Sequence, residues 1–416
     1  MPQLSAHAVE APAADIADRF LATRALSEAL VEPLSEGDAT IQSMEDASPA
    51  KWHLAHTTWF WETFLLRDHK RGYALYDERW PFLFNSYYEA EGARHPRAQR
   101  GVLSRPSVAE ILEWRAHVDC EMEPLLGEES LNPLITLGIT HEEQHQELLL
   151  SDNKHAMFLN PTGPAIWKGA FDGPIPPVRG WIEYPGGIAR IGHEGAGFAF
   201  DNEGPAHRVL LEPFALARSL VTNGEWEEFI ADGGYRNVSL WLSDGWAWVQ
   251  ANSVEAPLYW RNRDGEPEQF THCGWQRRDP DAPVAHISYY EADAYAQWAG
   301  ARLPTEFEWE AIAASHDAAA GNQLDGAAPP VPIGGGGLFG DVWQWTRSAY
   351  SPYPRFAPAA GTVGEYNGKF MSGQFVLRGA SCATVRGHSR STYRNFFYPH
   401  QRWIFTGLRL ARDLPA

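Results

Sequence analysis

Residues 132–158, NPLITLGITHEEQHQELLLSDNKHAMF, decide the fold of the first half of the chain. The Asn-Pro pair at the start of this stretch suits a helix cap followed by a first helical residue. Leucine and histidine then recur on one helical face, at Leu134, Leu137, His141, His145 and Leu148. Side chains that share a face in this way point into a core. The sequence therefore predicts a long helix that carries two histidines inward.

Three more helices are predicted upstream of this one. Their approximate ranges are 15–34, 48–66 and 107–126, and the second starts at Ser48-Pro49, a cap followed by a residue suited to the first turn. Four apolar-striped helices of this length are typical of a four-helix bundle. The long stretch between the second and third helices is then a crossover that carries functional residues.

The composition changes after the fourth helix. Residues 160–179 read NPTGPAIWKGAFDGPIPPVR, and their prolines and glycines prevent the helix from continuing. Short alternating segments among many Gly, Pro and Trp residues follow, with brief helices, which indicates an irregular α+β domain. We therefore expect an α+β protein with two domains, residues 1–165 and residues 166–416.

Charge, cysteine content and hydropathy limit the kinds of partner. A net charge of -19 disfavours binding to nucleic-acid phosphates or anionic lipid. The three cysteines, Cys120, Cys273 and Cys382, are few and odd in number, which argues against a disulfide framework. No secretory signal and no run of apolar residues long enough for a membrane span is evident. We expect a cytoplasmic protein with small-molecule partners, and a homo-oligomer is compatible with this reading.

Four histidines on two of the predicted helices form a candidate metal site. His141 and His145 are one helical turn apart, ~5.4 Å along the axis, and leave the same face. His53 and His56 are three residues apart on the second helix, and either could supply a third nitrogen from across the bundle. The apolar face of that helix favours His56 as the third metal ligand. Imidazole binds Zn, Cu, Fe and Ni, so these residues do not choose the metal, and ordinary buried histidines are the alternative reading.

A second motif overlaps the histidine pair. Residues 141–145 also read H-E-x-x-H, the helix motif of zinc metalloproteases, in which Glu142 would act as the general base. No later segment resembles the third ligand of that class. A zinc hydrolase is therefore an alternative function that rests on a short pattern.

Several blocks of sequence resemble the ergothioneine-biosynthesis sulfoxide synthases. The DinB-like half of that family is similar to KWHLAHTTWFWETFLL at 51–66, FNSYYEAEGARHPRAQRG at 84–101 and THEEQHQELLL at 140–150. Its second half, a formylglycine-generating-enzyme-type domain with a C-type-lectin-like fold, is similar to RLPTEFEWE at 302–310, VLRGASCAT at 376–384 and RNFFYPHQRWIFTGLRLAR at 394–412. The resemblance spans most of residues 48–412.

The resemblance implies a mononuclear non-haem iron(II) enzyme that uses O2. Such an enzyme couples a cysteine-type thiol to C2 of the imidazole of hercynine (Nα-trimethylhistidine) and gives a sulfoxide. Carried over to this chain, the iron ligands are His56, His141 and His145, while His53 lies outside the ligand set.

The resemblance also implies roles for residues around the iron. Tyr87 and Tyr88 supply the catalytic phenol, a proton or hydrogen-bond donor for the oxygen chemistry, with the choice between them open. Arg97 and Arg100 bind the thiol substrate, as a guanidinium suits a carboxylate. Contacts to hercynine come from Gln144, Asn395 and Phe396.

Two positions near the C-terminus bear on the sulfur donor. The branch of the family that uses γ-glutamylcysteine resembles R-N-W-D, with an Arg six residues after the Asn. This chain has Phe397 in place of the acid and Gln401 in place of the Arg, which favours free cysteine. The same blocks are similar to selenoneine synthases, so γ-glutamylcysteine and a selenosugar are the alternative donors.

Overall fold

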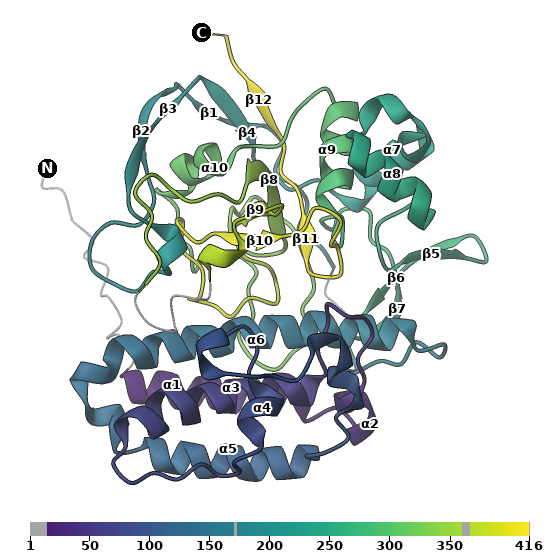
Figure 1. The fold of residues 1–416 in the computed structure, drawn as a ribbon. Coiled ribbons are helices and arrows are strands. Elements are labelled where there is room, and N and C mark those ends of the chain that lie inside the picture. Colours follow the sequence, from purple (N-terminus) through teal and green to yellow (C-terminus); the bar gives the residue numbers. More distant parts are fainter. Residues whose placement is uncertain (1–14, 170–172, 360–366, 416) are drawn as a thin grey trace, which may run out of the picture.

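The computed structural model describes residues 15–169, 173–359 and 367–415. Figure 1 shows a layer of helices from the first half of the chain on one side and the strand-rich second half on the other, with α6 between them. The α+β fold class and the N-terminal four-helix bundle expected from the sequence are confirmed.

The bundle consists of four long helices. They are α1 (Ile16–Val31), α3 (Ala50–Trp61), α5 (Val108–Met122) and α6 (Asn132–Leu159). A π-helical turn at Glu62–Arg67 extends α3. The start of α3 differs from the expectation: Pro49 occupies the N-cap position, and the backbone N–H of Ser48 donates to Asp152 at 2.7 Å. A capping box between Ser107 and Glu110 starts α5, as this pair of residue types favours.

Short helical segments fill the crossover and the connections of the bundle. They are α2 (Glu36–Thr40), α4 (Trp80–Phe84) and 3₁₀ turns at Glu89–Glu91, Arg97–Val102, Leu125–Gly127 and Glu129–Leu131. The ring of Trp80 in α4 packs edge-on against Trp114 of α5, with centroids 4.9 Å apart. This contact holds the crossover against the bundle, and the end of α4 reaches the histidine cluster.

The described part of the second half contains four small sheets. Their strands are β1 (Trp181–Tyr184), β2 (Gly187–Ile191), β3 (His207–Leu211), β4 (Phe214–Ala217), β5 (Trp260–Arg263), β6 (Glu266–Thr271), β7 (Gly274–Arg277), β8 (Trp343–Ala349), β9 (Phe375–Arg378), β10 (Asn395–Phe397), β11 (Thr406–Gly407) and β12 (Ala411–Asp413). The sheet orders are β1-β4-β12, β10-β9-β8-β11, β2-β3 and β5-β6-β7. All pairings are antiparallel except that of β11 with β8.

Helices and short turns surround these sheets. The helices are α7 (Asn223–Ala231), α8 (Ser243–Asn252), α9 (Tyr289–Trp298) and α10 (Glu306–Ala313), with 3₁₀ turns at Asp201–Glu203, Gly234–Arg236, Val238–Leu240 and Gly368–Phe370. Arg394 donates to both carboxylate oxygens of Glu306 in α10, at 2.8 and 3.0 Å. This buried ion pair fixes the start of β10, where two of the expected substrate contacts lie.

The two halves share part of one hydrophobic core. The apolar cluster of the bundle includes Leu324, Cys382, Ala383 and Phe405 from the second half. Among the described residues, no helix is long and apolar enough to cross a membrane.

Candidate metal centre and substrate site

Three buried histidines come together inside the bundle. His56 lies on α3, and His141 and His145 lie on α6, with exposed fractions of 1%, 3% and 9%. One ring nitrogen of each lies within 4.8 Å of the others, so one metal ion can reach all three. The donor set is chemically suitable, since three imidazoles leave coordination positions for substrate.

The burial of the triad keeps its imidazoles neutral, which is the form that binds a metal. Burial lowers the pKa of His141 to about 4. The pKa of His56 lies well below its ordinary value because of burial and the nearby His141, and that of His145 because of burial and the nearby His56. Protons therefore do not compete with a metal at neutral pH.

Neighbouring groups orient the His56 ring. Its Nδ1–H donates to the carbonyl oxygen of Phe84 at 2.6 Å, which leaves Nε2 for a metal. The ring lies nearly parallel to the indoles of Trp52 and Trp59, with centroids 4.7 and 5.4 Å away. His53, the other candidate on α3, lies beside His145 and outside the three-histidine group.

The carboxylate of Glu142 is held by side chains of the bundle core. It accepts hydrogen bonds from Arg24, Arg115, Ser27 and the Trp61 indole at 2.6 to 2.9 Å. Burial opposes its ionisation, but Arg24 and Arg115 outweigh burial and lower the pKa of Glu142 to about 2. A carboxylate with its oxygens fully engaged is a poor general base, so the geometry argues against the zinc-hydrolase reading.

The two tyrosines of the crossover face different surroundings. Tyr87 is half-buried, its phenol oxygen accepts a hydrogen bond from Arg97, and its ring meets Phe370 of the second half edge-on, 5.1 Å away. Tyr88 is buried, and its ring packs against Trp59 and Phe64, with centroids 5.5 and 5.2 Å away. Tyr88 thus packs on Trp59, the indole that stacks on His56, while Tyr87 lies at the junction of the two halves.

The two expected thiol-binding arginines lack a carboxylate partner among the described residues. Arg100 is 4% exposed, lies 3.3 Å above the Trp52 ring, and donates to the hydroxyls of Ser48 and Ser86. Burial lowers the pKa of Arg100 to about 9. Arg97 donates to the Tyr87 phenol and to the backbone carbonyl of Asp46, both of them neutral oxygens. Both guanidinium charges are therefore available to an anionic ligand.

The expected hercynine contacts come from α6 and from β10, and of these residues only Gln144 of α6 has a side-chain contact between the two halves in the described part of the chain. The Gln144 side chain donates to the Tyr393 phenol at 2.7 Å. Phe396 stacks on Tyr350 with centroids 4.1 Å apart, and Asn395 precedes it on β10. Tyr393 is a partner of Gln144 that the sequence reasoning missed, although it lies directly before the matching block at 394–412.

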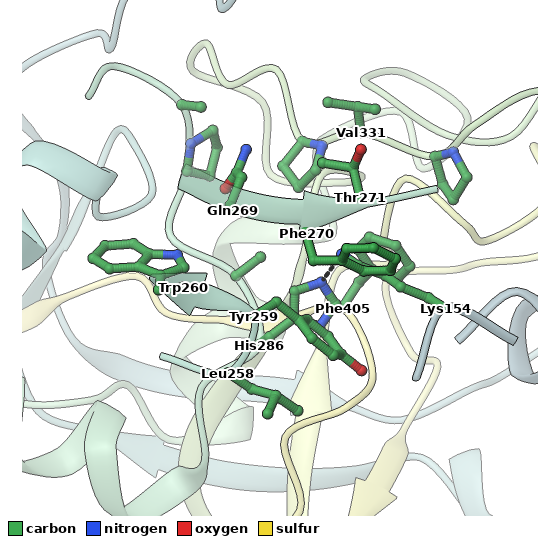
Figure 2. A pocket seen from close by; sticks show the side chains of 15 residues that line it. Lys154, Leu258, Tyr259, Trp260, Gln269, Phe270, Thr271, His286, Val331 and Phe405 are labelled. Atoms are coloured by element: carbon green, nitrogen blue, oxygen red, sulfur yellow. Dashed lines mark hydrogen bonds between the residues drawn. The ribbon is translucent and has the colours of Figure 1, made fainter. Parts of the chain in front are cut away.

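Several further side chains of α6 bind the second half. Glu143 contacts His388 at 2.8 Å, and Glu147 accepts from Trp343 at 2.7 Å. Near the end of the helix, the Nζ of Lys154 lies 2.7 Å from Nε2 of His286. Figure 2 shows Lys154 and His286 with Tyr259 and Phe405 around a narrow pocket. One helix therefore carries both the histidine pair and much of the contact between the two halves.

Comparisons with known proteins also divide the chain into a first and a second half. Residues 19–149 match the DinB superfamily, and residues 173–327 and 325–414 match the sulfatase-modifying factor enzyme 1-like domain. Hercynine oxygenase from Mycolicibacterium thermoresistibile is 34% identical over 422 residues, which cover 91% of this chain and 90% of that protein. The chain belongs to the hercynine oxygenase family. Its members are the sulfoxide synthases of ergothioneine biosynthesis, so this chain is an oxidoreductase.

Further similar proteins match most of the chain or part of it. Hercynine oxygenase from Mycolicibacterium smegmatis is 34% identical and covers 88% of this chain and 91% of its own length. The formylglycine-generating enzyme of Thermomonospora curvata is 29% identical and covers 57% of this chain and 94% of its own. The structure of PvdO from Pseudomonas aeruginosa aligns at 22% identity and a TM-score of 0.38, covering 56% of this chain and 94% of that one. The similarity to hercynine oxygenases thus extends over both halves.

Proposed function

We propose that this chain is an iron(II)- and O2-dependent enzyme that joins the sulfur of cysteine to C2 of the imidazole of hercynine. The product is hercynylcysteine sulfoxide. The observation that carries the proposal is the buried, neutral triad of His56, His141 and His145 in a chain that matches a hercynine oxygenase over 91% of its length. The net reaction is balanced: a thiol, an imidazole C–H and O2 give a sulfoxide and one water.

The side chains around the triad support a division of roles. Iron(II) held by the three histidines would supply the O2-dependent redox chemistry. Arg97 and Arg100 bind the carboxylate of the thiol substrate, because neither has a carboxylate of its own among the described residues. Tyr87 or Tyr88 provides the phenol that donates a proton or hydrogen bond to the reacting oxygen.

Contacts from both halves hold hercynine. Gln144 and Asn395 offer amide oxygens to its trimethylammonium group, and Phe396 offers an aromatic face. Because Gln144 is on α6 and β10 belongs to the second half, the substrate site forms only when the two halves are docked.

Cysteine is the proposed sulfur donor. The Phe397 ring packs edge-on against Trp403, and Gln401 donates to Asp46 at 3.1 Å. Neither position offers the charged pair expected for γ-glutamylcysteine, and the Asp46 carboxylate would repel a second acidic group. The alternative donors are γ-glutamylcysteine and a selenosugar.

The decisive experiment is aerobic incubation of iron-loaded protein with hercynine and each candidate donor, followed by mass spectrometry. Hercynylcysteine sulfoxide, formed only when iron, O2 and cysteine are all present, is the expected result. Protein incubated with hercynine alone and zinc-loaded protein are the controls. If no donor gives a sulfoxide with iron-loaded protein, the proposed function is wrong.

A further inference from the structure

His53 lies against the metal triad with both ring nitrogens engaged. Its Nδ1 is 2.9 Å from Nδ1 of His145, and its Nε2 is 3.1 Å from a carboxylate oxygen of Asp152. His53 is 3% exposed and Asp152 is 4% exposed. The buried row of groups therefore runs from the carboxylate, through one imidazole, to a candidate ligand.

The hydrogen-bonding types fix the direction of each bond in this row. A carboxylate only accepts, so Nε2 of His53 carries the hydrogen, and Nδ1 of the neutral ring is then an acceptor. Nδ1 of His145 must carry the hydrogen that His53 accepts. This leaves the lone pair of His145 on Nε2, the nitrogen that a metal would use when Nδ1 is occupied in this way.

Asp152 is itself held from two further directions. Its carboxylate accepts from the backbone N–H of Ser48 at 2.7 Å, just before α3, and from the Trp403 indole of the second half at 2.8 Å. Three N–H donors surround one carboxylate, which fixes its position and keeps it acceptor-only. Trp403 lies 251 residues from Asp152 in sequence, so the row ends in the second half of the molecule.

We propose that Asp152 and His53 are positioning residues that set the tautomer and ring orientation of His145 for metal binding, and that Trp403 ties this row to the docked second half. The inference rests on the proposed metal centre. The hydrogen-bond partner of a metal-binding imidazole raises its basicity and fixes its ring, and loss of such a partner commonly weakens metal affinity about 10- to 100-fold.

Two variants of His53 test whether the hydrogen bonds of this row matter for metal binding or whether His53 only fills space. In His53→Gln, the amide oxygen can accept from His145 while the amide NH₂ donates to Asp152, so both bonds are preserved. In His53→Leu, the volume is partly kept but both bonds are lost. Metal-free protein is titrated with Co(II), and the ligand-field absorption bands report affinity and geometry independently of turnover.

If the row positions His145, His53→Gln should bind Co(II) nearly as tightly as wild type, while His53→Leu should bind it about 10- to 100-fold more weakly. Equal binding of Co(II) by wild type and His53→Leu would overturn the positioning role of His53 and leave the proposed metal centre intact. Equal loss in both variants would overturn it as well, because a direct ligand gives that pattern. Failure of wild-type protein to bind Co(II) would instead contradict the proposed metal centre.

A second measurement needs no substitution and decides the matter if His53→Leu does not fold. In zinc-loaded protein labelled with ¹⁵N-histidine, NMR shows which ring nitrogen of each histidine carries a hydrogen. We expect hydrogen on Nε2 of His53 and on Nδ1 of His145. Hydrogen on Nδ1 of His53 would refute the proposed direction of the row.

Discussion

Replacing Lys154 by Met is expected to remove a pH dependence of stability that the wild-type protein shows above pH 7. Lys154 is 5% exposed, contacts His286, and lies over the rings of Tyr259 and Phe405, with no carboxylate bonded to it among the described residues. Burial lowers its pKa from 10.5 to about 7, with a small opposing effect of Cys382. Met keeps the length of the stem and cannot take up a proton.

The sign of the effect follows from the lowered pKa of Lys154. Between pH 7 and about 10.5 the unfolded chain holds a proton on this amine and the folded chain does not. The free energy of unfolding of the wild-type protein therefore rises with pH through this window, by at most about 1.4 kcal/mol per pH unit. Over the full window the upper limit is about 5 kcal/mol.

Other titrating groups face the Lys154 amine, and the comparison must cancel them. Burial lowers the pKa of His272 to about 3 and that of His286 well below its ordinary value, so neither titrates in the window. Burial raises the pKa of Cys382 well above its ordinary value, so this thiol gives an opposite slope above about pH 8.5. The difference between wild type and variant removes that contribution.

The assay is urea unfolding at several values between pH 7 and 10, with Lys168→Met as a matched control at an exposed lysine. Lys154→Met should gain stability relative to wild type as the pH falls towards 7, while Lys168→Met keeps a constant difference. A constant difference for Lys154→Met across the range would mean that the amine is charged in the folded protein, and the reasoning from its burial would be refuted.

The remaining predictions concern the metal and the chemistry. Alanine at any one candidate ligand should remove most bound iron and nearly all turnover, measured by metal analysis, whereas full iron in His56→Ala and loss of iron in His53→Ala would reverse the assignment. Tyr87→Phe or Tyr88→Phe should slow sulfoxide formation by ~10²–10⁴-fold and divert thiol to sulfinic acid, and a double mutant with normal yield would rule out a catalytic phenol. Cysteine should have a higher kcat/KM than γ-glutamylcysteine at fixed hercynine, and the reverse order would contradict the assignment. Glu142→Gln should lower the free energy of unfolding by about 3–5 kcal/mol, because it leaves two buried arginines short of a counter-charge, and an unchanged urea midpoint would contradict this.

Local patterns in the sequence were sufficient to predict the helices of the bundle and the inward direction of the histidine pair. The four-residue spacing of His141 and His145 places both on one face whatever surrounds them, and the capping box at Ser107 marks the start of α5. Such features depend on neighbours within about one turn, which is why they are legible without a structure.

Features that depend on distant partners were not predictable in the same way. The H-E-x-x-H pattern gives no sign that Glu142 faces Arg24 and Arg115, which are 118 and 27 residues away in sequence. His53 and His56 are both buried, and their different surroundings depend on how α3 lies against α6. In the sequence, the apolar face of the helix favours His56 only slightly, since a spacing of three residues places both near the bundle interior, and the family resemblance made the choice.

The double use of α6 bears on how this protein could be recombined with its relatives. His141 and His145 alternate along the helix with Glu143 and Glu147, which bind the second half, so no cut in the chain separates the candidate metal ligands from the docking contacts. A chimaera that exchanges residues 173–414 alone would set a foreign surface against this helix. The smallest transplantable unit therefore includes α6 together with the second half, and the histidine pair travels with it.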